Sequence, residues 1–172
     1  LRHISSQLNS EVPDDHITFG IWEDVYNTTL NQNGTVLLIL ARSPAREDLF
    51  SWAGPIDKTA NVIFCLNEAA ELFSTADPSE MRIGAVTDDI AASDLIAAGV
   101  TDIVYADTPE ELIRYLEDGS IDGWAYAAMP GRELIHKYAS DPSAIVPVHT
   151  LNTHDYYYAF NVHTPAPLVQ GF

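Results

Sequence analysis

Short hydrophobic runs recur at regular intervals in the middle of the chain, separated by longer amphipathic stretches. The runs are rich in β-branched and aromatic residues, which predicts strands, and the stretches between them have the length expected of helices. The predicted strands are 62–66, 82–86, 102–106, 123–127 and 144–151, and the predicted helices are 67–74, 89–98, 109–117 and 130–139. Strands alternating with helices of ~10 residues indicate crossover connections and a mostly parallel sheet, so we expect an α/β protein.

The boundaries of these helices carry the residues that start and stop a helix. Asp88 or Asp89 can accept a hydrogen bond from the first turn of the helix that follows, and Gly99 lies where that helix should end. Thr108 is a good cap for the next helix, with Pro109 at its first position. This capping chemistry supports the positions of the two predicted helices.

The beginning and the end of the chain are less regular. Here the pattern predicts strands at 17–22, 35–40 and 156–160, a helix at 23–32 and a turn at 51–55. The C-terminal stretch is too short to be a domain, so we expect it to return and pack on the first block. The predicted organisation is therefore two lobes, residues 1–61 plus 152–172 and residues 62–151.

Acidic residues far outnumber basic ones. The chain has 25 Asp and Glu against 8 Lys and Arg, which gives a formal net charge of −17 at pH 7. A nucleic-acid-binding surface needs clustered Lys and Arg, so we expect no nucleic-acid partner. The longest apolar run, 36–41, is far shorter than the ~20 residues of a membrane-spanning helix. The single cysteine, Cys65, lies in a predicted strand and cannot form a disulfide within the chain.

Motifs for cofactors and catalysis are absent from the sequence. It contains no GxxxxGK[ST] phosphate loop, no GxGxxG, no HExxH, no CxxC and no GxSxG nucleophile turn. His149, His154 and Asp155 could be argued as metal ligands, but the spacing of the two histidines matches no helical face, and polar loop residues are the simpler interpretation. We therefore expect no cofactor, no metal and no catalytic residue.

Two of the few arginines, Arg42 and Arg46, lie close together after a predicted strand, in a turn with Ser43. In this position an arginine can present its planar guanidinium group to a ligand carboxylate. Alternatively, both arginines pair on the surface with the neighbouring Glu47 and Asp48, which would contribute little stability. The residues alone leave both interpretations open.

The run Ser43-x-x-Arg46, followed by Phe50-x-Trp52-x-Gly54-Pro55, resembles the [ST]xxR…F…P signature of extracellular solute-binding proteins of family 3. The resemblance continues in the same order at 82–89, 119–125 and 157–160, like that family's "rvGv", "G-x-[IV]-D-A" and "yyiaf" segments. It implies a periplasmic-binding-protein type II fold, with two α/β lobes of mostly parallel sheet flanked by helices. A ligand would bind between the lobes and the protein would close around it.

The same resemblance implies roles for residues of the first lobe. Arg46 would hold a ligand carboxylate, and Ser43 would brace the turn that carries it. Trp22 and Trp52 would either form aromatic walls of the ligand site or belong to the core.

In the second lobe, Thr87, Asp88 and Asp89 mark the helix start whose backbone N–H groups would offer an anion site. Amino-acid-binding members have Ser or Thr at this start, a hydroxyl at the position of Ala41 and an acid at the position of Ala127. A carboxylate at a helix start repels an anionic ligand, and losing the acid removes a charge-assisted bond of ~1.5–3 kcal/mol. We therefore expect an amino-acid-like or other small polar solute rather than a standard α-amino acid.

The family's opening strand and its "G-[FY]-x-x-D-[LIV]" helix have no counterpart in the sequence, and 1–8 resembles only the end of that helix. Either the sequence begins after this opening segment, or the first lobe is incomplete and borrows the missing strand from a partner chain. An open sheet edge of that kind would favour a homodimer.

The predicted function is an extracytoplasmic, non-enzymatic solute-binding domain for ABC-type uptake, located in the periplasm or at the cell surface and compatible with a membrane anchor. Its partners would be a small-molecule ligand and a membrane permease. One alternative is a ligand-sensing or degenerate ectodomain whose partner is the transmembrane part of a receptor. A lower alternative is a dehydratase-like enzyme on the same scaffold, which would need a general acid and base from Asp88, Asp89 and Arg46.

Overall fold

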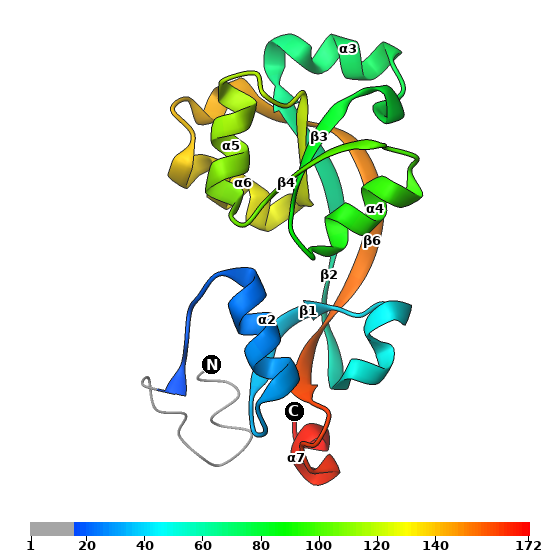
Figure 1. The fold of residues 1–172 in the computed structure, drawn as a ribbon, viewed down its shortest axis with the longest axis vertical. Coiled ribbons are helices and arrows are strands. Elements are labelled where there is room, and N and C mark those ends of the chain that lie inside the picture. The colour runs from blue at the N-terminus through cyan, green and yellow to red at the C-terminus, as the bar shows by residue number, and fades with distance from the viewer. Residues whose placement is uncertain (1–15) are drawn as a thin grey trace. The chain divides into compact units, whose positions relative to one another are not determined.

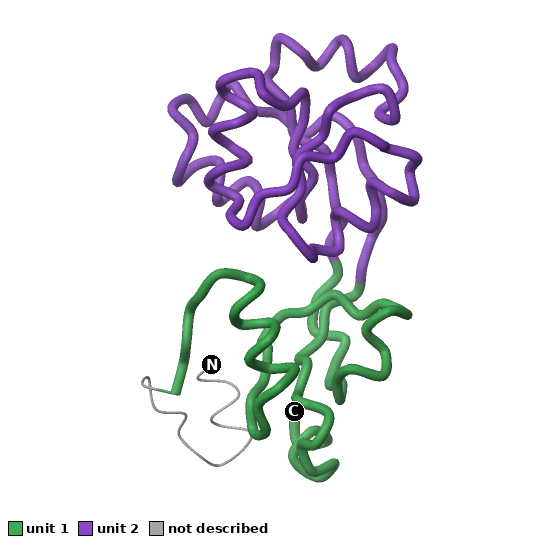
Figure 2. The backbone as a smooth tube through the Cα atoms, viewed as in Figure 1, with its two compact units in different colours: residues 1–58, 155–172 green, residues 59–154 purple. Residues whose placement is uncertain are grey.

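The computed structural model describes residues 16–172, so the expectation for residues 1–8 lies outside the described part of the chain. The chain divides into two compact units, Leu1–Lys58 with Asp155–Phe172 and Thr59–His154 (Figure 2). Both boundaries fall inside long strands, β2 (Phe50–Leu66) and β6 (Ile145–Asn161), so each of these strands contributes to both units.

The strands follow the order β1-β6-β2-β5-β3-β4. In unit 2, β3 (Arg82–Val86) is parallel to β4 (Asp102–Ala106) and to β5 (Gly123–Ala127), whereas β2 and β5 are antiparallel. In unit 1, β1 (Val36–Ala41) runs antiparallel to β6. The parallel pairs therefore lie in the part of the chain where the alternating pattern predicted crossovers, and the predicted α/β class is confirmed.

Short helices connect the strands of unit 2 (Figure 1). Their bounds are α3 Ala70–Thr75, α4 Ile90–Ala97, α5 Pro109–Glu117 and α6 Ala128–Tyr138, with 3₁₀ turns at Asn67–Ala69, Pro78–Glu80 and Pro142–Ala144. The predicted strands at 82–86, 102–106 and 123–127 and the predicted helix at 109–117 are confirmed to the residue. The predicted helix at 67–74 is a 3₁₀ turn that leads into α3.

The expected capping groups begin and end these helices. The Asp89 carboxylate accepts a hydrogen bond from the Ala91 N–H at the start of α4, and the Thr108 hydroxyl accepts one from the Glu111 N–H at the start of α5. Gly99 follows α4 with φ +85°, a conformation that L-residues with a side chain rarely adopt.

The core of unit 2 consists of aliphatic side chains from the strands and from the helix faces turned toward them. Ile63, Ile83 and Leu95 are fully buried in it. Gly84 allows α5 to approach β3 closely, because a Cβ atom there would come within 2.7 Å of the Leu112 and Ile121 side chains. The glycine in the middle of β3 therefore has a packing role.

Unit 1 contains α2 (Trp22–Asn31), β1, the 3₁₀ helix Pro44–Leu49 and α7 (Ala166–Gln170), together with the unit-1 ends of β2 and β6. Its buried cluster is small, with Leu40, Phe50 and Ala159 at its centre. The predicted helix at 23–32 corresponds to α2 and the predicted strand at 35–40 corresponds to β1, each displaced by one residue.

Three predictions for the irregular parts of the chain are wrong. Residues 17–21 form no strand, since no described strand pairs with them and Phe19 is 92% exposed. The predicted turn at 51–55 is part of β2, where the Trp52 side chain packs against Phe50 and Tyr157. The predicted strands 144–151 and 156–160 are one continuous strand, β6.

Candidate functional site

Backbone hydrogen bonding and a proline order the turn that carries Arg42 and Arg46. Ser43 is extended (φ −143°, ψ 159°) and its carbonyl accepts a hydrogen bond from the Arg46 N–H at 3.0 Å. Pro44 occupies the first position of the 3₁₀ helix, where a missing N–H costs nothing. Ser43 thus braces the turn through its backbone, with no capping bond from its hydroxyl group.

Arg46 is buried, with only 9% of its surface exposed. Its Nη1 donates to the carbonyl oxygen of Ala41 at 3.3 Å, and its guanidinium carbon lies 5.9 Å from the ring centre of Trp22 and 5.5 Å from that of Tyr26. At these distances the guanidinium group interacts favourably with the aromatic faces. Ala41 therefore contributes its main-chain carbonyl oxygen to the surroundings of Arg46.

An aromatic row extends from Trp22 across unit 1. Consecutive ring centres are 5.6, 5.4, 5.6 and 5.9 Å apart, and the row comprises Trp22, Tyr26, Phe50, Trp52 and Tyr157. The Trp22 indole N–H is buried and has no acceptor among the described residues. An unsatisfied buried donor costs about 1–3 kcal/mol, so a ligand acceptor at this atom would recover free energy.

Arg42 lies at the other end of the row, over the rings of Trp52 (5.6 Å) and Tyr157 (5.1 Å). Two of its three guanidinium nitrogens, Nε and Nη2, donate to the two carboxylate oxygens of Glu47, with Nε and Oε2 2.8 Å apart. This hydrogen-bonded pairing raises the pKa of Arg42 and lowers the pKa of Glu47. For Arg42, therefore, the surface ion-pair interpretation is correct.

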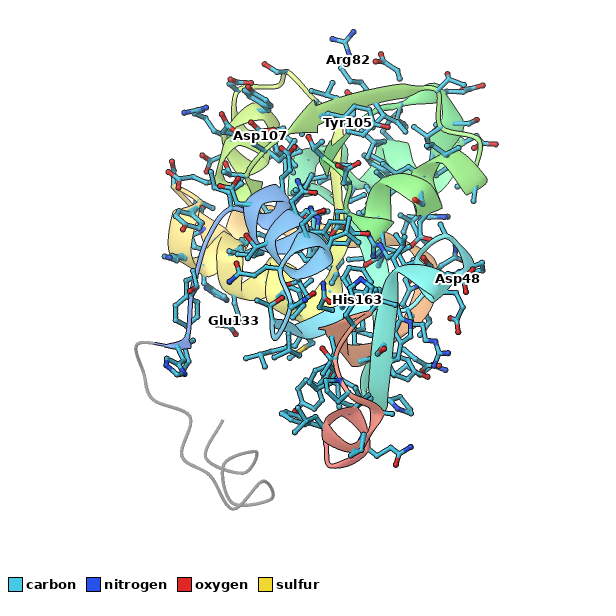
Figure 3. All side chains as sticks on the ribbon, turned by 60° about the horizontal axis from the view of Figure 1, so that its bottom comes forward. Asp48, Arg82, Tyr105, Asp107, Glu133 and His163 are labelled. Atoms are coloured by element: carbon cyan, nitrogen blue, oxygen red, sulfur yellow. The ribbon has the colours of Figure 1, made fainter. Side chains whose placement is uncertain are left out.

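In unit 2, the turn between β3 and α4 carries three of the predicted residues. The Thr87 hydroxyl donates to the Ala106 carbonyl at 3.3 Å and lies 3.5 Å from the carboxylate of Asp107, which is labelled in Figure 3. Asp88 is exposed and has φ +58°, so the turn imposes a left-handed conformation on it. Asp89 caps α4, so its carboxylate occupies the position where a ligand anion would meet the helix N-terminus.

Tyr126 and Ala127 lie at the end of β5, next to this turn. The pKa of the Tyr126 phenol is raised to about 12, by burial and by the negative charge of Asp89. Ala127 is buried at the start of α6 and is opposite Asn61 of β2 in the antiparallel ladder. No carboxylate is available at position 127 to bind an ammonium group.

The predicted residues therefore form two separate groups, one in each unit. Ala41, Ser43, Arg46, Trp22 and Trp52 lie together in unit 1, and Thr87, Asp88, Asp89 and Ala127 lie at neighbouring strand ends in unit 2. Sequence reasoning missed Tyr26, Tyr157 and Tyr126. Tyr26 could have been found, because it is one helical turn beyond Trp22 on the same face.

Metal-ligating and nucleophilic side chains among residues 16–172 are the remaining candidates for a functional centre. No group of three His, Cys, Asp or Glu in this part of the chain is placed to hold a metal ion. His154 instead contacts the Asp94 carboxylate. Cys65 is buried in β2, and burial raises the pKa of its thiol to about 11.

Comparison of the sequence with protein-family models gave no match, and comparison with curated proteins gave none. Comparison of the structure gave clear matches. A histidine kinase sensor domain with similarity to periplasmic binding proteins superposes with a TM-score of 0.81 at 22% identity, over 99% of this chain and 73% of that one. The holo form of ArgBP from T. maritima gives a TM-score of 0.79 at 13% identity, over 99% and 73%.

An amino acid ABC transporter substrate-binding protein from Streptococcus pneumoniae, bound to L-arginine, gives a TM-score of 0.80 at 13% identity, over 99% of this chain and 70% of that one. These identities establish likeness of fold and leave ligand and partner open. The three matches each cover 99% of this chain and therefore extend over both of its compact units. The chain has the periplasmic-binding-protein type II fold, as its motifs predicted.

Proposed function

We propose that this protein is an extracytoplasmic domain that binds a small polar solute bearing a carboxylate or similar acceptor group. The observation that carries the proposal is the environment of Arg46, a buried guanidinium group beside Trp22 and Tyr26. The unsatisfied Trp22 indole N–H supplies a second buried donor in unit 1. Two donors and aromatic faces suit a ligand with one acidic end and a flat or apolar body.

The proposed ligand is not a standard α-amino acid. An α-ammonium group needs a carboxylate or several acceptors, and Ala127 provides none at the position where amino-acid binders have an acid. The Asp89 carboxylate already accepts a hydrogen bond from the Ala91 N–H at the start of α4, which disfavours a ligand anion there. The carboxylate of the ligand would therefore bind to unit 1.

The proposed mechanism is closure stabilised by the ligand. β2 crosses from one unit to the other after Lys58 and β6 crosses after His154, so two strands connect the units. A ligand that contacts Arg46 in one unit and the turn at Asp88 in the other only when the protein is closed would shift the population toward the closed state.

Uptake and sensing are both candidate uses of such closure. Uptake is supported by the likeness to amino-acid ABC transporter substrate-binding proteins, and its partner would be a membrane permease. Sensing is supported by the likeness to a histidine kinase sensor domain, and its partner would be the transmembrane part of a receptor. No helix in the described part of the chain has both the length and the apolar character needed to cross a membrane.

A non-enzymatic role suits the site chemistry better than a dehydratase. A general acid and base have to converge on one substrate atom. The carboxylate of Asp89 is engaged at the start of α4, and Arg46, whose guanidinium group stays protonated in proteins, cannot act as a base.

Self-association through the edge of the sheet is part of the proposal. Among residues 16–172, β1 pairs with β6 and lies at the end of the strand order, and Ile39 in β1 is 61% exposed. If this edge joins two copies, Ile39→Lys should shift the mass measured by light scattering from dimer to monomer. Ile96→Lys, at a similarly exposed isoleucine on α4, is the matched control.

The binding proposal is tested by a thermal-shift screen against small carboxylates, dicarboxylates, aromatic acids, amino acids, polyamines and sugars. A ligand present at one hundred times its Kd adds about 2.7 kcal/mol, which raises Tm by roughly 5–10 °C for a chain of this size. Arg46→Ala should abolish the shift, whereas Arg42→Ala, which removes an equal charge already paired with Glu47, should retain it. A shift that survives Arg46→Ala, or silence across the panel, contradicts the proposal.

A further inference from the structure

Four polar side chains meet inside unit 2, and one of them, Asn61, is the ladder partner of Ala127. The carboxylate of Asp94, in the middle of α4, is the centre of the cluster. Its Oδ2 accepts a hydrogen bond from the Asn61 side chain of β2 at 2.7 Å and lies 2.7 Å from His154 Nε2 of β6. Its Oδ1 accepts a hydrogen bond from the Asn152 side chain of β6 at 2.9 Å. One buried carboxylate thus joins three elements that are far apart in sequence.

Burying these polar and charged groups costs desolvation free energy that an apolar core would not. Asp94 is 4% exposed and Asn61 is fully buried, and the side-chain carbonyl oxygen of Asn61 has no partner among the described residues. Well-packed apolar residues of similar size often stabilise a core as much as a buried ionic cluster does. Stability alone therefore does not account for these residues, and their positions in the chain suggest a second role.

The cluster lies where the two connecting strands enter unit 2. Unit 2 begins at Thr59, so Asn61 is at its edge on β2, and His154 is the last residue of unit 2 on β6. The third element is α4, whose first turn is capped by Asp89 and follows the left-handed residue Asp88. Asp94 of α4 therefore contacts both connecting strands where they enter unit 2. The turn immediately before α4 contains three of the predicted ligand residues, Thr87, Asp88 and Asp89.

We propose that Asp94 is a positioning residue that anchors both connecting strands to α4, so that bending between the units is confined to Lys58–Ala60 and Asp155. The inference rests on the closure mechanism proposed above. When the Asp94 contacts are intact, a ligand that displaces α4 at its first turn also displaces both connecting strands, because Asp94 is hydrogen-bonded to each of them. Without them, each strand bends at its own point and the two units lose a defined hinge.

Hydrogen exchange of the ligand-free protein tests the anchor directly. In Asp94→Asn, amides of 61–64 and 151–154 should exchange about tenfold faster than in the parent protein, because bonds to a charged acceptor are lost locally. Amides of β3 that exchange through local openings, in which the Asp94 contacts stay intact, should change much less. Asp118→Asn is the matched control, an exposed carboxylate of the same unit that bonds only to the neighbouring Ser120.

The result that overturns the anchor is equal acceleration in β3 and in the connecting strands, which would show an ordinary loss of stability. If Asp94→Asn does not fold, Asn152→Ala takes its place, since Asn152 is exposed and its removal deletes one of the three donors. His154→Gln keeps a neutral donor near the carboxylate and should preserve the parent exchange pattern.

Hinge behaviour is measured by spin-label distances in a Cys65→Ala background, with labels at Glu23 of unit 1 and Glu133 of unit 2. Without ligand, the distribution of distances between the two labels should be about twice as wide in Asp94→Asn as in the parent protein. The width in Asp118→Asn should match that of the parent protein. An unchanged width in Asp94→Asn refutes the positioning role. Because no ligand is present, this outcome is independent of the thermal-shift result, so failure of the binding proposal and failure of the anchor can be distinguished.

Discussion

The Asp94 cluster makes a prediction about pH. Burial of Asp94 opposes its ionisation, but hydrogen bonds from His154, Asn152 and Asn61, together with the charge of His154, outweigh burial and lower its pKa below the ordinary value of 3.8. A carboxyl with a depressed pKa contributes stability above its unfolded pKa and loses that contribution as pH falls through its folded pKa. The network should therefore stabilise the protein fully at pH 7 and progressively less below about pH 4.

The size of the effect follows from the three contacts. A bond to a charged acceptor contributes about 1.5–3 kcal/mol against about 1 kcal/mol for a neutral one, so Asp94→Asn loses roughly 1 kcal/mol at each of the two bonds to Oδ2. The bond from Asn152 to Oδ1 is lost, because the amide nitrogen that replaces this oxygen cannot accept it. The amide costs less to bury than the carboxylate, which returns part of the loss. We expect Asp94→Asn to lower the free energy of unfolding by about 2 kcal/mol at pH 7.

Urea titrations of both proteins at pH 7 and at pH 3 measure this difference. The parent and Asp94→Asn should converge as the pH falls below about 4, because the unfolded parent protein then binds a proton at Asp94 that the folded protein takes up only at lower pH. Glu133→Gln, at an exposed acid on α6, controls for general charge effects. A difference in stability that stays constant between the two pH values refutes the assignment of a charged, network-stabilised Asp94.

Three further predictions concern packing, capping and reactivity. Gly84→Ala should destabilise the protein by about 1–3 kcal/mol in urea unfolding, because its Cβ would lie 2.7 Å from Leu112 and Ile121 side-chain atoms. Thr108→Ala should cost about 0.5–2 kcal/mol, since it removes the acceptor of the Glu111 N–H at the start of α5, and Thr108→Ser should restore most of the loss. Cys65 should resist a thiol reagent at pH 8 until the protein is unfolded, because its thiol is buried and its pKa is raised to about 11; rapid labelling of the native protein would contradict its placement in β2.

Much of unit 2 could be predicted from the sequence because its local signals agree with its tertiary structure. The strands around Gly84 and Trp124 are short apolar runs, and the helices between them carry Asp89 and Thr108 as caps. Propensity, capping and burial all indicate the same elements there. The structural matches at 11–22% identity confirm the fold that the scattered motifs indicated.

The parts that could not be predicted depend on partners distant in sequence. The alternation of Ile17, Phe19 and Ile21 has the period of a strand, but in the described chain no neighbouring strand pairs with it. Asp94 and Asn61 are 33 positions apart, and Asp94 and His154 are 60 apart, so no local spacing reveals their cluster. The roles of the predicted ligand residues remain predictions until a ligand is identified.

The most direct test of ligand binding at Arg46 is the nuclear magnetic resonance signal of the indole N–H groups, of which the chain has three, one for each Trp. During titration with a solute that raises Tm, the Trp22 indole signal should move, because its buried N–H gains an acceptor beside Arg46. In Arg46→Ala, the same addition should leave it in place. A solute that binds without moving the Trp22 signal, or that moves it equally in Arg46→Ala, would contradict the proposed site.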